Sequence, residues 1–435
     1  MPDFPSLYRL HPNCPPDSMD VRIPGSKSYT NRALLLAALA KGESVLRNAL
    51  FSDDTHWMIE ALTELGVEIQ ADKAARTLTI RSQGKPTRLP SQPLYCGNAG
   101  TAIRFLTPFC ALGEGEVILT GNARMQERPI HDLLEGMRGL GVEVEDIHGT
   151  GCPPIRIRGG GMRGGKCRID GTRSSQYFSA LLLSAARMKE GLEIEIEGDL
   201  VSKPYIDMTL AILRRFGIES VNQNYQRLSV PAGQEPQAAA VMIEGDASAA
   251  TYFLALAAIG RTTVRVHPLP EDTCQGDAEF ARILSRMGCR QQHKGEFIEV
   301  RGGELHGIEA DLNAMSDTAQ TLAAVALFAE GSTTIRNIAN ARIKETDRIA
   351  AIAREITRLG GTVEEYPDGL TIHPASAYHA ADIETYDDHR MAMSFAVTAL
   401  RIPGIGILNP GCVTKTFPEF FEVIAPWIRC EAKDA

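Results

Sequence analysis

The sequence predicts an α/β protein in which six repeats of about 72 residues are distributed over two domains. Two observations lead to this fold class. A glycine or aspartate, followed by small polar residues and an Ala/Leu-rich segment, recurs along the chain, and the 435-residue length exceeds what one ordinary hydrophobic core needs. The six openings lie 71 to 74 residues apart, at Gly25, Gly97, Gly171, Gly245, Asp317 and Asp388. Unrelated helices would not keep that spacing.

The first helix of each repeat is predicted to be buried. Residues 33–40 and 322–329 are apolar nearly all round, whereas a surface helix would show one polar face. We therefore expect these helices inside their domain, with strands outside. Their polar, glycine-rich starts leave backbone N–H groups and the positive end of the helix dipole available to an anion. Ordinary helix capping is the alternative interpretation of any single start.

The second helix of each repeat has a glycine after its last turn, followed by a β-branched strand. Such glycines are typical left-handed helix caps, and five occur, at Gly66, Gly141, Gly217, Gly288 and Gly360. The sixth repeat ends instead in FPEFFEVIAPWIRC, and we expect it to lack the trailing strand. The segment up to Pro24 is then expected to supply what that repeat is missing.

This pattern places one domain in residues 1–24 and 244–435 and the other in residues 25–243. The boundary near Gly245 follows PAGQEPQAAA, which has the composition of a linker or loop.

Composition excludes several functional classes. Hydrophobic residues at 44% and charged residues at 23% are typical of a folded protein, and the net charge of −9 opposes nucleic-acid binding. The nine cysteines are scattered without a CxxC pair, which argues against a disulfide framework or a zinc site and for a reducing compartment. No signal-like start and no run of 18 apolar residues is present, so a cytoplasmic protein without a membrane span is expected.

Basic and neutral polar residues gather at the first three openings. PGSKSYTNR contains Lys27, Ser28 and Arg32, which can reach one small anion, and GNAGTAIR offers Asn98, Gly100 and Arg104. Arg104 could instead form a structural ion pair with a carboxylate. Arg128 in RMQERP is another candidate for anion binding, and the alternative is that it is a solvated surface residue. GTRSSQY and VSKPYIDMT add groups suited to hydroxyls and phosphate, although capping and turn chemistry would also explain them: Ser174, Ser175, Gln176, Ser202 and Tyr205.

The carboxyl-terminal half combines cations with carboxylates. NARIKETDR contains Asn340, Lys344, Glu345 and Arg348, and the four-residue spacing of Lys344 and Arg348 predicts one helix face with an anion between them. Asp317 is expected to act as a helix cap or as a base. YDDHR adds Asp388, His389 and Arg390, and TKTFP adds Lys415. For His389, capping or support of a neighbouring group is an alternative to direct catalysis. Carboxylates near several cations can hold unusual proton affinities, as acid–base chemistry needs.

Common catalytic motifs are absent. Neither a GxSxG elbow, an HExxH pair nor a GxGxxG between strand and helix occurs, so covalent serine, zinc and nicotinamide chemistry lose support.

The ordered motifs together carry a family resemblance. PGSKSxTNR, GNAGTAxR, RMxERP, SSQ, SKPYIDxT, EGDAS, RxKETDR, DDHRMAM and KTFPEFF resemble 5-enolpyruvylshikimate-3-phosphate synthases over residues 22 to about 422. The resemblance implies two inside-out α/β barrel domains, each of three βαβαββ-type repeats. It also implies transfer of the enolpyruvyl group of phosphoenolpyruvate to the 5-hydroxyl of shikimate 3-phosphate, in a cleft between the domains. No metal or other cofactor is expected, and the protein should be a monomer.

The resemblance assigns roles by motif position. Asp317 is expected to be the base, Glu345 the acid, and Lys27 a catalytic group near both substrates. Shikimate 3-phosphate would be bound by Lys27, Ser28, Arg32, Ser174, Ser175, Gln176, Ser202, Tyr205, Asp317, Asn340 and Lys344. Phosphoenolpyruvate would be bound by Lys27, Asn98, Gly100, Arg128, Gln176, Arg348, His389, Arg390 and Lys415.

Three departures from the family pattern concern loop shape and inhibitor sensitivity, at Phe105, Ala123 and Ala341. Because Gly100 is small, the resemblance implies sensitivity to glyphosate.

The sibling transferase acting on UDP-N-acetylglucosamine usually has a reactive cysteine where Ala123 stands. A non-catalytic phosphate-binding relative would be expected to lose Asp317 or Glu345. An RNA-terminal cyclase is opposed by the acidic charge balance.

Overall fold

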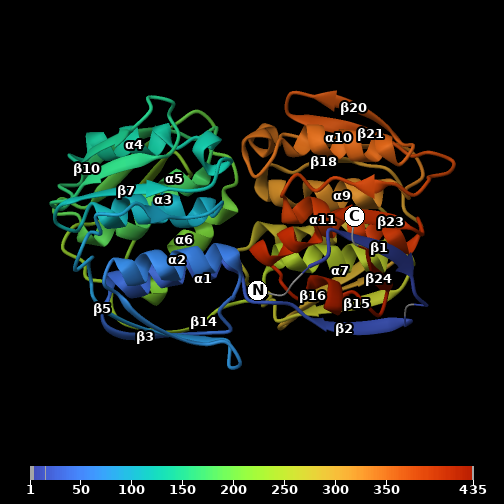
Figure 1. The fold of residues 1–435 in the computed structure, drawn as a ribbon, viewed down its shortest axis with the longest axis horizontal. Helices are drawn as coiled ribbons and strands as arrows, with labels where there is room; N and C mark the ends of the chain where they lie inside the picture. Colours follow the sequence, from blue (N-terminus) through green and yellow to red (C-terminus); the bar gives the residue numbers. More distant parts are fainter. Residues whose placement is uncertain (1–3, 15, 434–435) are drawn as a thin grey trace. The chain divides into compact units, whose positions relative to one another are not determined.

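The computed structural model describes residues 4–14 and 16–433, which form two compact domains (Figure 1). The continuous domain comprises Gly25–Ile243, and the discontinuous domain combines the chain up to Pro24 with the chain from Glu244 onward. The chain therefore passes between the domains twice, at the same two positions where the repeat pattern divides the sequence.

Within the described residues, every repeat contributes to a four-stranded sheet of one design. An edge strand pairs parallel to the strand after the first helix, and two antiparallel strands complete the sheet, as in the order β10-β11-β13-β12. The same plan appears six times in the described chain, which is the βαβαββ repeat expected.

The elements of the continuous domain follow this plan in chain order. The first repeat has α1 (Lys27–Leu39), β3 (Lys41–Arg47), α2 (Asp53–Glu64), β4 (Glu68–Asp72) and β5 (Thr77–Gln83). The second has β6 (Leu94–Tyr95), α3 (Gly100–Cys110), β7 (Glu116–Thr120), α4 (His131–Gly139), β8 (Glu143–Asp146) and β9 (Ile155–Arg158). The third has β10 (Gly165–Asp170), α5 (Ser175–Ser184), β11 (Leu192–Glu197), α6 (Pro204–Arg215), β12 (Val221–Gln223) and β13 (Arg227–Val230), and β14 (Ala240–Met242) follows.

The discontinuous domain repeats the arrangement. It begins with β1 (Leu7–Pro12) and β2 (Ser18–Arg22), and its fourth repeat has α7 (Ala247–Gly260), β15 (Thr263–His267), α8 (Phe280–Arg286), β16 (Arg290–Lys294) and β17 (Phe297–Arg301). The fifth has β18 (Glu309–Asp311), α9 (Ala319–Ala326), β19 (Thr333–Arg336), α10 (Arg348–Arg358), β20 (Thr362–Tyr366) and β21 (Gly369–His373). The sixth has β22 (Asp382–Ile383), α11 (His389–Ala396), β23 (Ile405–Leu408), α12 (Phe420–Val423) and β24 (Ile428–Lys433).

The edge strands of the first and fourth repeats are exchanged. β2 leads directly into α1, yet it pairs parallel to β15 of the fourth repeat, with Val21 opposite Val266. Conversely, β14 leads into α7 but pairs parallel to β3 of the first repeat, with Val241 opposite Leu46. Each domain thus closes its sheet with a strand whose helix belongs to the other domain, and this exchange fixes the two crossing points of the chain.

The sixth repeat is completed by the amino-terminal segment, as expected. β1 lies between β23 and β24 and is antiparallel to both, with Leu10 opposite Ile405 on one side and Cys430 on the other. The expectation that this repeat lacks a trailing strand is wrong, because β24 follows α12 directly. β24 carries no sequence signal, since no glycine cap precedes it, and what the repeat lacks is the second strand of its hairpin.

The first helices form the core of each domain. In α7 every residue from Ala247 to Ile259 is buried, which confirms the prediction made from its apolar surface. α9 packs against both α7 and α11, and the Thr321 hydroxyl lies 3.3 Å from that of Thr251 and 3.1 Å from that of Ser394. The glycines after the second helices adopt positive φ, between 74° and 113°, as left-handed caps require.

Candidate active site

The start of α1 presents Lys27 and Ser28. The Ser26 hydroxyl caps the helix by accepting from the Tyr29 N–H at 3.4 Å, and the Lys27 Nζ lies 3.3 Å from Oδ2 of the buried Asp54. A Cβ on Gly25 would lie 1.9 Å from the Asn48 carbonyl oxygen, so a glycine is required for this close approach. The repeat opening therefore fixes Lys27 beside a carboxylate that the sequence analysis did not identify.

Arg32 is buried at 1% exposure among neutral partners. Its Nε donates to the Thr209 hydroxyl at 2.8 Å, and its terminal nitrogens donate to the Ser179 hydroxyl and to the carbonyls of Ser28 and Tyr205. Burial without a carboxylate partner lowers the pKa of Arg32 to about 10. Four hydrogen bonds hold the guanidinium, and among residues 4–14 and 16–433 no acidic side chain pairs with its charge.

The second repeat brings two arginines against Gly100. The guanidinium of Arg128 donates to the backbone and side-chain oxygens of Asn98, at 3.0 Å each, and that of Arg104 donates to the Gln176 amide oxygen at 3.0 Å. Arg128 is 5% exposed, so the alternative of a solvated surface arginine is wrong. A Cβ on Gly100 would lie 2.6 Å from a terminal nitrogen of each arginine. Glycine at this position therefore leaves room for both cations.

The third repeat places its polar residues at the starts of α5 and α6. The Ser174 hydroxyl caps α5 by accepting from the Gln176 N–H at 3.3 Å, so the capping alternative holds for this residue, and Ser175 is buried. Ser202 is buried with a positive φ of 56°, an uncommon backbone position for a non-glycine residue. The Tyr205 ring lies 5.9 Å from the Arg32 guanidinium carbon.

Asp317 is the centre of the discontinuous domain's charged residues. Its Oδ1 lies 2.5 Å from Lys344 Nζ and 2.8 Å from a terminal nitrogen of Arg348, while its Oδ2 accepts from Arg390 at 2.8 Å. The expectation of a helix cap is wrong, because Asp317 lies in the 3₁₀ turn η4 (Asn313–Thr318), where Thr318 occupies the position before α9. Its carboxylate binds three cations instead.

Lys344 and Arg348 do not share a helix face, which corrects the sequence-based expectation. Lys344 follows the 3₁₀ turn η5 (Ala339–Ile343), in which Asn340 lies, and α10 begins only at Arg348. The start is set by Asp347, whose carboxylate accepts from the Ala350 N–H at 3.1 Å. The anion between the two cations in this structure is Asp317 itself.

Arg348 binds three carboxylates while it is 1% exposed. Its Nε donates to Asp388 at 2.7 Å, and its terminal nitrogens donate to Glu345 at 2.9 Å and to Asp317. Burial lowers the pKa of Arg348, but Asp388, Glu345 and Asp317 outweigh burial and hold it above its usual range. We call Asp317, Lys344, Glu345, Arg348, Asp388 and Arg390 the charged cluster.

The sixth repeat supports this cluster from α11. Asp388 caps the helix by accepting from the Arg390 N–H at 2.9 Å, and it also holds Arg348. His389 is fully buried as the first residue of the helix, with its Nδ1 3.5 Å from Asp388. Lys415 lies in the 3₁₀ turn η7 (Pro410–Lys415), with its Nζ 4.0 Å from Glu345. Asp388 stands out in the sequence only as part of the YDDHR motif, whereas in the structure it is the main partner of Arg348.

The pKa of Asp317 follows from these contacts. Burial raises the pKa of its carboxyl, but Arg390, Lys344 and Arg348 together outweigh burial and hold the pKa well below the ordinary value. Burial lowers the pKa of Lys344, and Asp317 compensates only in part. Asp317 can therefore accept a proton at neutral pH only after some of these cations move to another anion.

The fourth repeat also contributes, although sequence analysis assigned it no active residue. Asp277, in the 3₁₀ turn η3 (Gly276–Glu279), is 4% exposed and accepts from the Ser248 hydroxyl at 2.5 Å. Tyr252, four residues after Ser248 on α7, accepts from Arg390 at 3.4 Å. No motif signals these groups, because their relation to Asp317 arises from packing.

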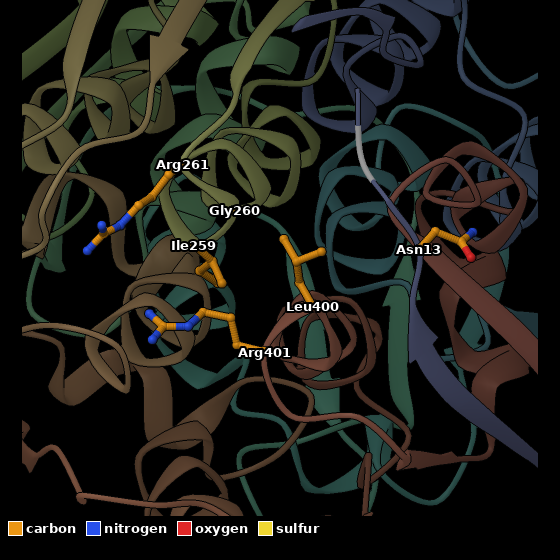
Figure 2. A pocket seen from close by; sticks show the side chains of 6 residues that line it. All are labelled: Asn13, Ile259, Gly260, Arg261, Leu400 and Arg401. Atoms are coloured by element: carbon orange, nitrogen blue, oxygen red, sulfur yellow. The ribbon is translucent and has the colours of Figure 1, made fainter. Parts of the chain in front are cut away.

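A cavity of about 400 Å³ lies at the other end of α7 (Figure 2). It is lined by Asn13, Ile259, Gly260, Arg261, Leu400 and Arg401. Because Gly260 is twelve residues beyond Ser248, the helical rise separates the two ends by about 18 Å. This cavity is not part of the charged cluster.

A membrane span would need a longer and more apolar helix than any found in residues 4–14 and 16–433.

The fold and these residues define a two-domain α/β enzyme of the kind that binds small, multiply anionic molecules. Residues 17–424 match the family model described as EPSP synthase (3-phosphoshikimate 1-carboxyvinyltransferase). The chain is 46% identical over 405 residues to the 3-phosphoshikimate 1-carboxyvinyltransferase of Marinomonas sp. (strain MWYL1), covering 93% of this chain and 95% of that one. It is 47% identical over 423 residues to the enzyme of that name from Pasteurella multocida (strain Pm70), covering 95% and 96%. The chain therefore belongs to the EPSP synthase family.

Solved structures agree with this assignment. The EPSP synthase of Acinetobacter baumannii superposes with a TM-score of 0.80 at 25% identity, over 98% of this chain and 99% of that one. An enolpyruvyl transferase from Streptomyces tendae, at 18% identity and a TM-score of 0.78 over 99% and 100% of the two chains, shares the fold. The family resemblance and the α/β fold class predicted from the sequence are confirmed.

Proposed function

We propose that this protein transfers the enolpyruvyl group of phosphoenolpyruvate to the 5-hydroxyl of shikimate 3-phosphate and releases phosphate, as a step of aromatic amino acid and chorismate biosynthesis. The observation that carries the proposal is the charged cluster, in which Asp317 binds Lys344, Arg348 and Arg390 while Glu345 lies between Arg348 and Lys415. It supplies a base, an acid and cations for phosphate and carboxylate groups.

Shikimate 3-phosphate is assigned to the hydroxyl-rich residues and their cations. Arg32 supports this assignment, because it is a buried cation whose contacts are all neutral, so a phosphate would supply the missing charge partner. Lys27 at the start of α1 would act on both substrates. The remaining groups would complete the site: Ser28, Ser174, Ser175, Gln176, Ser202, Tyr205, Asp317, Asn340 and Lys344.

Phosphoenolpyruvate is assigned to the arginine-rich positions. Arg128, beside Gly100 and Asn98, and the arginines Arg348 and Arg390 would bind the phosphate and carboxylate groups of the molecule. Gln176, His389 and Lys415 would complete this set. Binding energy from so many cations would bring two anionic substrates together, which they would otherwise resist.

The proposed chemistry is an addition followed by an elimination. Asp317 takes the proton of the 5-hydroxyl, and the 5-oxygen of shikimate 3-phosphate bonds to C2 of phosphoenolpyruvate. Glu345 gives a proton to C3, which forms a tetrahedral adduct. Glu345 then removes a C3 proton, the C2–C3 double bond forms again, and the C2–O bond to phosphate breaks. Because the cations lower the pKa of Asp317, their movement to the substrate anions would restore its basicity.

Two variants and one assay test this proposal. Phosphate release should occur with shikimate 3-phosphate plus phosphoenolpyruvate and not with UDP-N-acetylglucosamine plus phosphoenolpyruvate. Glu345→Gln and Asp317→Asn should keep phosphoenolpyruvate binding by calorimetry but lose on the order of 10² to 10⁴ in kcat. A variant that keeps most of its kcat would remove that residue from the mechanism, and equal turnover of both acceptors would exclude the proposed specificity.

Two finer properties belong to the same proposal. The enzyme would act as a monomer, since a single chain carries every residue assigned to the two substrates, and it would work in the cytoplasm. Light scattering after gel filtration should give a mass near 47.3 kDa, and a mass of twice that value would contradict the monomer.

A further inference from the structure

Asp277 is a buried acid that the proposed mechanism does not use. Its side chain is 4% exposed, its Oδ2 accepts from the Ser248 hydroxyl at 2.5 Å, and its Oδ1 accepts no hydrogen bond within residues 4–14 and 16–433. Buried carboxyl oxygens are usually paired, because an unpaired one loses its hydration without replacement. A carboxyl group kept in this condition requires an explanation.

Asp277 belongs to the surroundings of Asp317 through two routes. The turn η3, which carries Asp277, packs against η4, which carries Asp317. The second route runs along α7, where Ser248 and Tyr252 are four residues apart and therefore on one helix face. Ser248 holds Asp277, and Tyr252 accepts from Arg390, which in turn donates to Asp317 at 2.8 Å.

The charges that face Asp277 come from three further elements. They are Asp317 on η4, Arg390 on α11 and Asp246, the capping residue of α7. The two carboxylates oppose ionisation of Asp277, whereas Arg390 and the Ser248 hydroxyl favour it. On the adjoining helix α8, Arg282 pairs with the exposed Glu279.

We propose that Asp277 is a positioning residue that acts through Asp317 and Arg390. Its carboxyl group, anchored by Ser248, sets how strongly Asp317 holds a proton. When Asp277 is ionised, its charge disfavours a second anion at Asp317 and draws on Arg390, so Asp317 becomes a stronger base. When Asp277 is protonated, the three cations act on Asp317 without opposition and keep it weakly basic.

The pKa of Asp277 allows this role near neutral pH. Burial, followed by the charge of Asp317, raises the pKa of Asp277 to about 6, against the opposing effects of Arg390 and Ser248. The group therefore changes its charge just below the pH at which the enzyme would work. An acid limb in the pH dependence of kcat/KM is expected from this ionisation.

The inference rests on the proposed function for its kinetic consequence, so the first experiment does not use activity. Carboxyl ¹³C NMR of protein labelled at aspartate gives the titration of Asp277, assigned by the resonance that Asp277→Asn removes. In Asp317→Asn the pKa of Asp277 should fall, because an opposing carboxylate is gone and Arg390 is released. An unchanged titration of Asp277 would show that the two groups are not coupled and would overturn the inference even in an active enzyme.

The second experiment compares the pH profiles of two variants, one that should move the acid limb of kcat/KM and one that should abolish it. Ser248→Ala removes the hydrogen bond that favours the carboxylate, so the acid limb of kcat/KM should move to higher pH. Asp277→Asn removes the titration, so the limb near pH 6 should disappear and kcat above pH 7 should fall on the order of 10-fold, the equivalent of one pKa unit at Asp317.

Controls separate this role from a structural one. Asp272→Asn makes the same charge change at an exposed position of the same loop and should leave the profile unchanged. A uniform loss of activity with unmoved limbs in both Ser248→Ala and Asp277→Asn would contradict the proposal. If Asp277→Asn fails to fold, which its thermal midpoint would reveal, Ser248→Ala still tests the proposal. An acid limb of kcat/KM that does not move to higher pH in Ser248→Ala would contradict it.

Discussion

Arg32 and Arg348 are both 1% exposed, one in each domain, but their surroundings differ. Arg32 donates to hydroxyls and carbonyls, and its pKa is lowered to about 10 by burial. Arg348 donates to three carboxylates, and its pKa is raised because they outweigh burial. Among the residues that the structure describes, the same side chain therefore has only neutral partners in the continuous domain and three acidic partners in the discontinuous domain.

The difference teaches what each buried cation is suited to do. A guanidinium fixed by neutral partners costs desolvation in the free protein, and an anionic ligand can offset that cost. A guanidinium shared by Asp317, Glu345 and Asp388 stabilises those acids and fixes their positions. This supports the proposal that Arg32 is a binding group, whereas Arg348 first of all holds three acids of the charged cluster in place.

The largest effect is expected from Arg348→Met. It would leave three acids without their main cation, and removing one partner of a buried ion pair typically costs about 3–5 kcal/mol. Urea unfolding should show this loss, and turnover should fall below detection. Arg81→Met is the matched control, because Arg81 also contacts two carboxylates, Glu43 and Glu68, but at the exposed surface. A comparable loss of stability in Arg81→Met would contradict the importance of burial.

An intermediate and different effect is expected from Arg32→Met. Ser179 and Thr209 would still hydrogen-bond each other at 2.9 Å, and a buried charge without an acid would be gone, so unfolding free energy should change by no more than about 1 kcal/mol. Affinity for shikimate 3-phosphate should fall by roughly 10 to 100-fold, the value of a lost charge-assisted hydrogen bond. Calorimetry measures both. If this variant is as unstable as Arg348→Met, the contrast between the two arginines fails.

The smallest effect is expected from Gly100→Ala. The added Cβ would lie 2.6 Å from nitrogens of Arg104 and Arg128, which are the ends of flexible side chains, so they should shift while the fold persists. KM for phosphoenolpyruvate should rise on the order of 10-fold, with little change for shikimate 3-phosphate. Gly139→Ala, whose Cβ would meet only ordinary contact at 3.7 Å, is the control. Equal changes in both Michaelis constants would place the arginines elsewhere in binding.

Much of the architecture could be predicted because short stretches of the sequence determine it. The nearly uniform apolar surface of the first helices predicted that they are buried, and the glycines after the second helices predicted their left-handed caps. The exchange of β2 and β14 could not be predicted, since a strand's partner depends on how each domain closes and not on the strand's own residues. β24 was missed for the related reason that its strand follows α12 without the usual glycine signal.

The sequence by itself determined the repeats, the residue types at their openings and the family. Tertiary structure alone decided how these residues act on one another. Lys344 and Arg348 meet through the Asp317 carboxylate rather than along a helix. Asp388 and Asp277 act on groups of the neighbouring fifth repeat, and Asp54 pairs with Lys27 within the first repeat. The physical reason is that propensity and periodicity are properties of neighbouring residues, whereas charge and burial act through space.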